Sequence, residues 1–307
     1  MYDTVIIGGG PAAVAAGVYA ARKQMKTVFV ADQIGGQSVV SDGIANWIGD
    51  VLIPGAELAG NLKKHLMEYK DDITIAVPEK AQSITRNDDD SFLIKTNKNE
   101  YHSKTVIITT GGRHRKIGVP GEDLYNGKGV AYCATCDAPF FRDKDVAVIG
   151  GGNSGLESVV DLLPYARKVY LLARRDELRG DPITQKTIFD SPKVEIIYKS
   201  NTTKIIGKTM VTGLQYENLD TKESHDLEVQ GVFVEIGSVP NSDFVQDLVT
   251  CNERGEIVVD HRTFATSQRG VFAAGDVTDE LYKQNNIAAG DAIKALLSAY
   301  QYVQKAA

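Results

Sequence analysis

The chain has 307 residues, 43% of them hydrophobic and 24% charged, which is ordinary for a globular protein and leaves room for two domains. Its net charge of −6 argues against nucleic acid or an anionic membrane as the main partner, and no run of about 18 apolar residues is present to span a bilayer. A strand begins within the first few residues and leaves no room for a signal peptide, and three cysteines suit a reducing compartment, so we expect a cytoplasmic protein.

The N-terminal segment predicts a dinucleotide-binding unit. Residues 4–7 are an apolar run typical of a buried parallel strand, a turn from Gly8 to Ala13 follows, and residues 14–23 are an Ala-rich helix. In this order the first glycine permits the tight turn, the second lets the backbone approach a pyrophosphate, and the small last residue lets the helix pack on the strand. Residues 27–31 predict the next strand, and Asp32 after it can accept a hydrogen bond from an adenosine ribose.

Strands separated by turn residues follow. Residues 91–96 and the chain from Tyr101 onward flank a polar turn and predict a hairpin. Residues 105–110 predict a further strand, which ends at Gly111.

Cys133 and Cys136 are separated by two residues and followed by Asp137. Two thiols at this spacing can close and reopen a disulfide, and the adjacent carboxyl can move the protons of the exchange. Zinc is disfavoured because Cys251 is the one further cysteine and the five histidines are scattered, so no metal is expected. A structural disulfide is disfavoured because so short a loop removes little unfolded-chain entropy. The pattern therefore favours a redox dithiol, with Cys251 as a free thiol.

A second dinucleotide-binding unit follows the cysteines. Residues 145–149 predict a strand, the turn from Gly150 to Gly155 follows, and residues 156–163 predict a helix. After the next strand, residues 168–172, Arg174 and Arg175 begin at the same distance from the first glycine as Asp32 in the first unit. A carboxylate favours a free ribose 2′-hydroxyl, whereas paired guanidinium groups favour a 2′-phosphate. The two units therefore predict two different dinucleotides, the second of them NADP-like.

The remainder of the chain completes the two units. Residues 211–219, a polar turn at 220–224 and residues 229–237 predict the counterpart of the earlier hairpin region. Residues 270–276 predict a strand ending at Asp276, whose carboxyl can hold a polyol hydroxyl or cap a helix. Residues 285–304 predict a closing helix.

These motifs together make the chain resemble low-molecular-weight thioredoxin reductases over its whole length. It is especially similar to the C-terminal reductase portion of the bacterial flavoproteins that serve alkyl hydroperoxide reductase. The resemblance rests on ordered stretches at 8–13, 35–37, 46–49, 119–123, 133–137, 150–157, 237–241, 270–276 and 282–284.

The resemblance implies an α/β fold with two Rossmann-like domains, each a parallel sheet with a β-meander. A discontinuous FAD domain, residues 1–115 and 243–307, would contain an inserted NAD(P)H domain, residues 116–242, that carries the two cysteines. In the family this inserted domain rotates to present nicotinamide and disulfide to the flavin in turn. The family also implies a homodimer.

The resemblance also implies the site residues. Cys136 would face the flavin, Cys133 would attack the partner's disulfide, and Asp137 would be the acid/base, whereas Glu157 matches a family glutamate near the flavin or is a plain helix-surface residue. For FAD the expected residues are Gly8, Gly10, Pro11, Ala12, Asp32, Gly36, Gln37, Asn46, Gly111, Asp276 and Gln284. For NADPH, with NADH as the alternative, they are Gly150, Gly152, Asn153, Ser154, Arg174, Arg175, Arg179 and Gly237.

The expected activity is reduction of thioredoxin, or of a similar small redox protein, by NADPH through FAD and the Cys133–Cys136 disulfide. One alternative is a reductase for a glutaredoxin-like or peroxiredoxin-linked carrier that uses NADH. Further alternatives are a dithiol oxidase, a ferredoxin-driven relative, and a non-enzymatic flavin redox sensor.

Overall fold

The computed structural model describes residues 1–41 and 43–306. Within it the chain divides into two compact units. Unit 1 comprises residues 1–41, 47–113 and 239–306, and unit 2 comprises residues 43–46 and 114–238. Each unit contains a parallel sheet with helices packed on it, so the predicted α/β class is confirmed.

Unit 1 is built on a seven-stranded sheet in the order β3-β2-β1-β6-β5-β4, with β17 also pairing with β6. The strands are β1 (Tyr2–Ile7), β2 (Thr27–Val30), β3 (Thr74–Ala76), β4 (Ala81–Arg86), β5 (Phe92–Thr96), β6 (Glu100–Ile108) and β17 (Val271–Ala273). β1, β2, β3, β6 and β17 pair in parallel, whereas β4, β5 and β6 form an antiparallel meander. The residues predicted as a hairpin strand from Tyr101 and a separate strand at 105–110 are one strand, β6.

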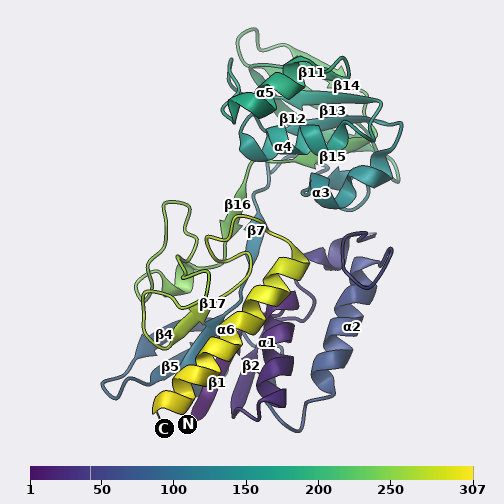
Figure 1. The fold of residues 1–307 in the computed structure, drawn as a ribbon. Coiled ribbons are helices and arrows are strands. Elements are labelled where there is room, and N and C mark those ends of the chain that lie inside the picture. The colour runs from purple at the N-terminus through teal and green to yellow at the C-terminus, as the bar shows by residue number, and fades with distance from the viewer. Residues whose placement is uncertain (42, 307) are drawn as a thin grey trace. The chain divides into compact units, whose positions relative to one another are not determined.

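The helices of unit 1 are α1 (Pro11–Arg22), α2 (Gly55–Met67) and α6 (Asn285–Ala306), with short 3-10 turns η1 (Gln37–Val40) and η3 (Asp243–Val245). α6 lies alongside α1, as Figure 1 shows. α1 permits this approach because its buried residues are mostly alanine and glycine. At Gly17 a Cβ atom would meet the side chains of Leu66 on α2 at 2.8 Å and Phe29 on β2 at 3.1 Å, so a larger residue there would force these side chains to shift.

Unit 2 contains a five-stranded parallel sheet and a three-stranded antiparallel sheet (Figure 1). The parallel sheet has the order β11-β10-β9-β15-β8, from β8 (Val130–Ala131), β9 (Asp145–Ile149), β10 (Lys168–Leu172), β11 (Val194–Ile197) and β15 (Gly231–Val234). The antiparallel sheet comprises β12 (Ser200–Gly207), β13 (Val211–Asn218) and β14 (Ser224–Leu227). The helices are α3 (Ala134–Asp137), α4 (Asn153–Leu162) and α5 (Pro182–Phe189), with η2 (Ala138–Phe141) after α3.

One predicted pairing in unit 2 is wrong. Residues 229–237 are not the partner of 211–219, because β13 pairs with β14, which begins inside the predicted turn. The apolar strand β15 instead lies between β9 and β8 in the parallel sheet, where all four of its residues are buried. The exposed, polar sequence of β14 gave no apolar signal of a strand.

Both glycine turns run directly into their helices. α1 begins at Pro11 and α4 at Asn153, each three residues earlier than the apolar pattern predicts. The last residues of each glycine motif are therefore helical, and the free backbone N–H groups of the first helical turn belong to the motif itself. Two of the segments in which the chain passes from one unit to the other pair as β7 (Gly112–His114) and β16 (Ser238–Pro240).

Candidate functional site

The Cys133–Cys136 disulfide lies in a single helical turn. The two Cα atoms are 5.3 Å apart, and the carbonyl of Cys133 accepts hydrogen bonds from the N–H groups of Cys136 (3.3 Å) and Asp137 (3.1 Å). Both cysteines are partly buried, and α3 begins immediately after Cys133. The predicted disulfide is confirmed, and it lies at the start of α3. We refer to residues 133–137 as the redox turn.

Unit 2 anchors the redox turn on two sides. The hydroxyl of Thr135 donates a 2.7 Å hydrogen bond to Asp161 of α4. On the other side, Tyr132 donates to Glu122 at 3.0 Å, and Glu122, only 2% exposed, also accepts from the N–H groups of Ile117 and Gly118. Burial and the neighbouring Glu122 raise the pKa of Tyr132 above its ordinary value, so its hydroxyl stays protonated as a donor. These contacts fix the chain on entry to the disulfide and were not predicted from the sequence.

The second glycine turn packs so closely on neighbouring backbone that a side chain at its first or last glycine would clash. Gly150 has φ +140°, and a Cβ there would meet the carbonyl oxygen of Glu235 at 2.2 Å. A Cβ at Gly155 would meet the carbonyl oxygen of Gly150 at 1.9 Å, which is why the helix can begin so close to the strand. Gly237, with φ +98°, lies beyond β15. The first turn of α4 thus lies at the carboxyl ends of β9 and β10, where α/β sheets bind ligands.

The predicted arginines lie on the loop beside this turn. Arg174 and Arg175 are exposed just after β10, and the preceding Ala173 is close enough that a Cβ at Gly151 would touch it at 3.2 Å. The N–H of Arg179 donates to the carbonyl of Gly151 at 2.7 Å, and its side chain pairs with Glu177 at 3.3 Å. The loop that carries the three arginines thus packs against the glycine turn in unit 2.

The first glycine turn has the same geometry in unit 1. Gly8 has φ +137°, and a Cβ at Gly9 would meet the carbonyl oxygen of Gln33 at 1.8 Å. Gly36 lies against it, since a Cβ there would approach the Cα of Gly10 at 3.0 Å. Ser38 and Asn285 exchange hydrogen bonds that join η1, which begins at Gln37, to the start of α6, which follows Gln284.

Asp276 lies at the carboxyl end of β17, close to the first turn of α1. The preceding Gly275 is near enough to α1 that a Cβ there would meet Ala12 at 3.3 Å. Burial raises the pKa of Asp276 and the charge of Lys283 opposes this shift. A desolvated carboxyl at this position favours a hydroxyl-bearing ligand.

The other predicted FAD residues do not all lie in the same unit. Asp32 is exposed two residues after the end of β2, and the carbonyl of Gly111, which has φ +64°, accepts a 2.9 Å hydrogen bond from the N–H of Asn241. Asn46 belongs to unit 2, whereas the other predicted FAD residues belong to unit 1, and Glu157 is exposed on α4. The assignment of these residues to FAD and NADPH stays a prediction.

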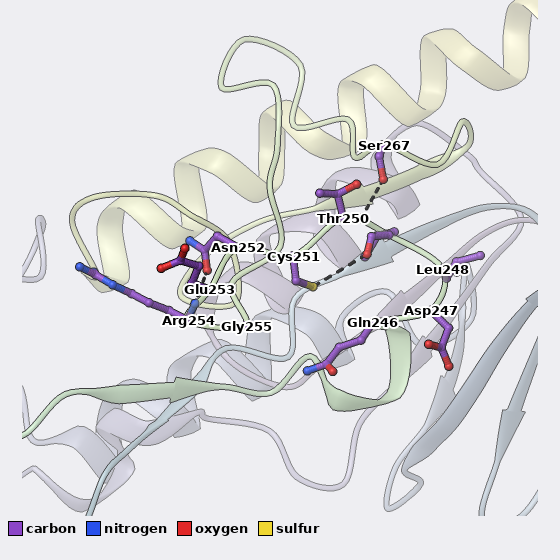
Figure 2. Close-up of a pocket in the computed structure, with 11 residues that line it drawn as sticks. Gln246, Asp247, Leu248, Thr250, Cys251, Asn252, Glu253, Arg254, Gly255 and Ser267 are labelled. Atoms are coloured by element: carbon purple, nitrogen blue, oxygen red, sulfur yellow. Dashed lines mark hydrogen bonds between the residues drawn. The ribbon is translucent and has the colours of Figure 1, made fainter.

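A separate hollow in unit 1 surrounds Cys251. Figure 2 shows it lined by residues 246–255 and Ser267, and its volume is about 750 Å³. Cys251 is a free thiol, as predicted, and burial raises its pKa, which leaves it less reactive than an ordinary thiol. None of the predicted site residues lines this hollow.

The family of pyridine nucleotide-disulphide oxidoreductases matches residues 2–292. The chain belongs to this family. Its curated relatives include the F component of alkyl hydroperoxide reductase in Staphylococcus epidermidis and in Staphylococcus aureus, each 43% identical over 302 residues. The match covers 98% of this chain and 59% of each relative, so the chain spans little more than half their length.

Solved structures of the same family share the whole fold of this oxidoreductase. Thioredoxin reductase from Streptococcus pyogenes is 37% identical with a TM-score of 0.92, and that from Giardia duodenalis is 31% identical with a TM-score of 0.90. Each match covers 99% of both chains. The predicted resemblance and the predicted pair of Rossmann-like domains are thereby confirmed. Among the helices that the structure describes, none combines the length and apolarity needed to cross a bilayer.

Proposed function

We propose that the chain is an FAD-dependent reductase that passes electrons from NADPH through the Cys133–Cys136 disulfide to thioredoxin or a similar small redox protein. The observation that carries this proposal is the closed disulfide in the same unit as one glycine turn, while unit 1 has a second glycine turn whose first glycine has nearly the same φ. The full-length likeness to thioredoxin reductases supports it.

The residues of unit 1 fit FAD. The pyrophosphate would lie on the N-terminal turn of α1, whose first backbone N–H groups have no partner within the helix. The carboxyl of Asp276 would accept a hydrogen bond from the ribityl chain. When bound, FAD would supply the two-electron chemistry that links a reduced nicotinamide to a disulfide.

The residues of unit 2 fit a pyridine nucleotide. The first turn of α4 would hold the pyrophosphate, and Arg174, Arg175 and Arg179 would pair with a 2′-phosphate. This arginine set favours NADPH over NADH, although Glu177 already pairs with Arg179 and reduces the local positive charge.

The two cysteines would have separate tasks. Cys136 would receive electrons on the flavin side, and Cys133 would attack the disulfide of the partner protein, forming a mixed disulfide that Cys136 then resolves. Asp137, directly after Cys136, would exchange protons with the thiols.

A second candidate partner is the carrier of a peroxiredoxin system. The 43% identity to the F component of alkyl hydroperoxide reductase favours it. In solution we propose a cytoplasmic homodimer, as the family resemblance implies.

The deciding experiment uses the purified holoenzyme. NADPH and NADH are titrated anaerobically while flavin absorbance is followed, and turnover is then measured with thioredoxin, a glutaredoxin and a peroxiredoxin-linked carrier. We expect bleaching at lower NADPH than NADH and the fastest turnover with thioredoxin. Bleaching without electron transfer to any of these carriers would overturn the proposed function.

A further inference from the structure

Asn153, which lies in the second glycine turn and is the first residue of α4, bonds to a loop 28 residues further along the chain. Its side-chain oxygen accepts a 2.8 Å hydrogen bond from the backbone N–H of Asp181. Because that partner is a donor, the oxygen of the amide and not its nitrogen must face the loop. Asn153 thus joins the glycine turn to the end of the segment that carries the three arginines. We refer to residues 173–181 as the arginine loop.

Two further contacts hold the same end of the arginine loop. The N–H of Arg179 donates to the carbonyl of Gly151 at 2.7 Å. Gly180 packs so closely on α4 that a Cβ there would meet Cδ1 of the buried Leu156 at 2.2 Å and the side-chain oxygen of Asn153 at 2.9 Å. Three consecutive loop residues therefore run along the glycine turn and the first turn of α4, and the hydrogen bond to Asn153 is the last of their contacts in chain order.

The other end of the arginine loop is fixed to the rest of unit 2. The N–H of Ala173 donates to the carbonyl of Ile197 at 2.9 Å, and the carbonyl of Ala173 accepts from the N–H of Ser200 at 3.0 Å. Residues 174–177, between the two ends, are exposed. Hydrogen bonds from guanidinium groups to a phosphate depend on their geometry, so the strength of such bonds from this loop depends on both ends staying in place.

An amide suits the position of Asn153. The first turn of α4 is where the phosphates of a nucleotide would lie. A carboxylate could accept the same hydrogen bond from Asp181, but its charge would repel those phosphates. A neutral amide oxygen holds the loop without that repulsion.

We propose that Asn153 is a positioning residue of the nucleotide site. It holds the arginine loop on the glycine turn and so sets how much more tightly unit 2 binds a nucleotide with a 2′-phosphate than one without it. The inference rests on the proposed NADPH site. It gives Asn153 an indirect role, through Asp181 and Arg179, in place of the direct contact with the nucleotide that the family resemblance implies.

The test breaks the same hydrogen bond from each side. Asn153→Ala removes the acceptor. Asp181→Pro removes the donor and leaves Asn153 in place, and the φ of Asp181, −55°, suits proline. The side chain of Asp181 also caps α5, because it accepts a 2.9 Å hydrogen bond from the N–H of Thr184. The matched control is therefore Asp181→Ala, which loses this cap and keeps the N–H that Asn153 accepts.

Two measurements are made on the oxidised holoenzyme of each variant. Calorimetric titration gives the affinities for NADP⁺ and NAD⁺, which differ only in the 2′-phosphate and do not reduce the flavin. Amide hydrogen exchange, followed by mass spectrometry without any nucleotide, reports how firmly the arginine loop is held.

We expect Asn153→Ala and Asp181→Pro each to raise the Kd for NADP⁺ by about threefold to tenfold and to change the Kd for NAD⁺ by less than about twofold. Both variants should also exchange faster in the arginine loop. The double variant should bind NADP⁺ no more weakly than either single variant, because both changes remove one hydrogen bond. Asp181→Ala should match the parent in the affinity for NADP⁺ and in the exchange of this loop.

An equal rise in Kd for NADP⁺ and NAD⁺ would overturn the proposal, and so would an effect of Asn153→Ala that Asp181→Pro does not share, because either result points to direct contact between Asn153 and the nucleotide. Unchanged exchange in the arginine loop of both variants would overturn it as well.

Failure of the proposed function gives a different result. A parent that binds NAD⁺ as tightly as NADP⁺ would contradict the NADPH preference in that function. The positioning role of Asn153 would then be decided by the exchange rates alone, since faster exchange in both variants supports it and unchanged exchange overturns it.

Discussion

The hydroxyl of Thr135, which lies between the two cysteines, donates a 2.7 Å hydrogen bond to Asp161 on α4. α4 is the helix that begins at the second glycine turn, so one short helix joins the predicted nucleotide turn to the disulfide. The disulfide loop is thus held by side chains of the unit in which it lies, and its conformation can persist when the disulfide opens.

Loss of this hydrogen bond should slow partner reduction. Thr135→Val removes the donor and keeps the shape of the side chain, and a hydrogen bond to a charged acceptor at this exposure contributes about 1 kcal/mol, or about fivefold in rate if it is made when the partner reacts. The measurement is steady-state turnover with thioredoxin. Thr187→Val, an exposed threonine on α5 that bonds only its own helix, should leave turnover unchanged. Equal rates for Thr135→Val and the parent would show that the contact is dispensable.

Replacement of Arg174 and Arg175 by neutral residues should change the preference of the enzyme for NADPH over NADH. If these side chains pair with the 2′-phosphate, the double change to Gln should raise the KM for NADPH about tenfold or more and leave the KM for NADH nearly unchanged. Flavin reduction with each nucleotide measures this. The control is Lys208→Gln, an exposed change on the turn between β12 and β13. An equal loss with both nucleotides would refute the 2′-phosphate assignment.

Asp276→Asn should have opposite effects on flavin binding and on the apoprotein. The folded protein raises the pKa of this carboxyl by burial, so the unfolded chain releases the proton at lower pH, and the ionised group lowers stability as pH rises through that range. Asparagine removes this penalty at neutral pH, and the free energy of unfolding of the apoprotein should rise. It also removes the strong acceptor, so FAD affinity should fall about tenfold.

Urea unfolding of the apoprotein and flavin release on dilution measure the two effects, with the exposed Asp247→Asn as control. Unchanged flavin affinity in Asp276→Asn would remove this carboxyl from the FAD site.

The sequence allowed both glycine turns and the disulfide to be predicted because each depends on residues close together in the chain. Gly8 and Gly150 have nearly equal φ values, +137° and +140°, as two copies of one motif should. The arrangement of β13, β14 and β15 could not be predicted, because β14 is too polar and exposed to show an apolar pattern. The apolar sequence of β15 reflects its burial between β8 and β9, and this position depends on contacts between distant parts of the chain.

The supports of the redox turn are long-range contacts between residues without a motif. Glu122 and Asp161 bind Tyr132 and Thr135 from two different parts of unit 2, and each is an ordinary acidic residue in the sequence.

The most direct test of the proposed electron path is a single-turnover experiment on Cys133→Ser and the parent holoenzyme. Each is reduced anaerobically with one equivalent of NADPH and mixed with oxidised thioredoxin, while flavin absorbance and thioredoxin thiols are followed. We expect NADPH to bleach the flavin of both proteins and only the parent then to reduce thioredoxin. Reduction of thioredoxin by Cys133→Ser at the parent rate would contradict the proposed path.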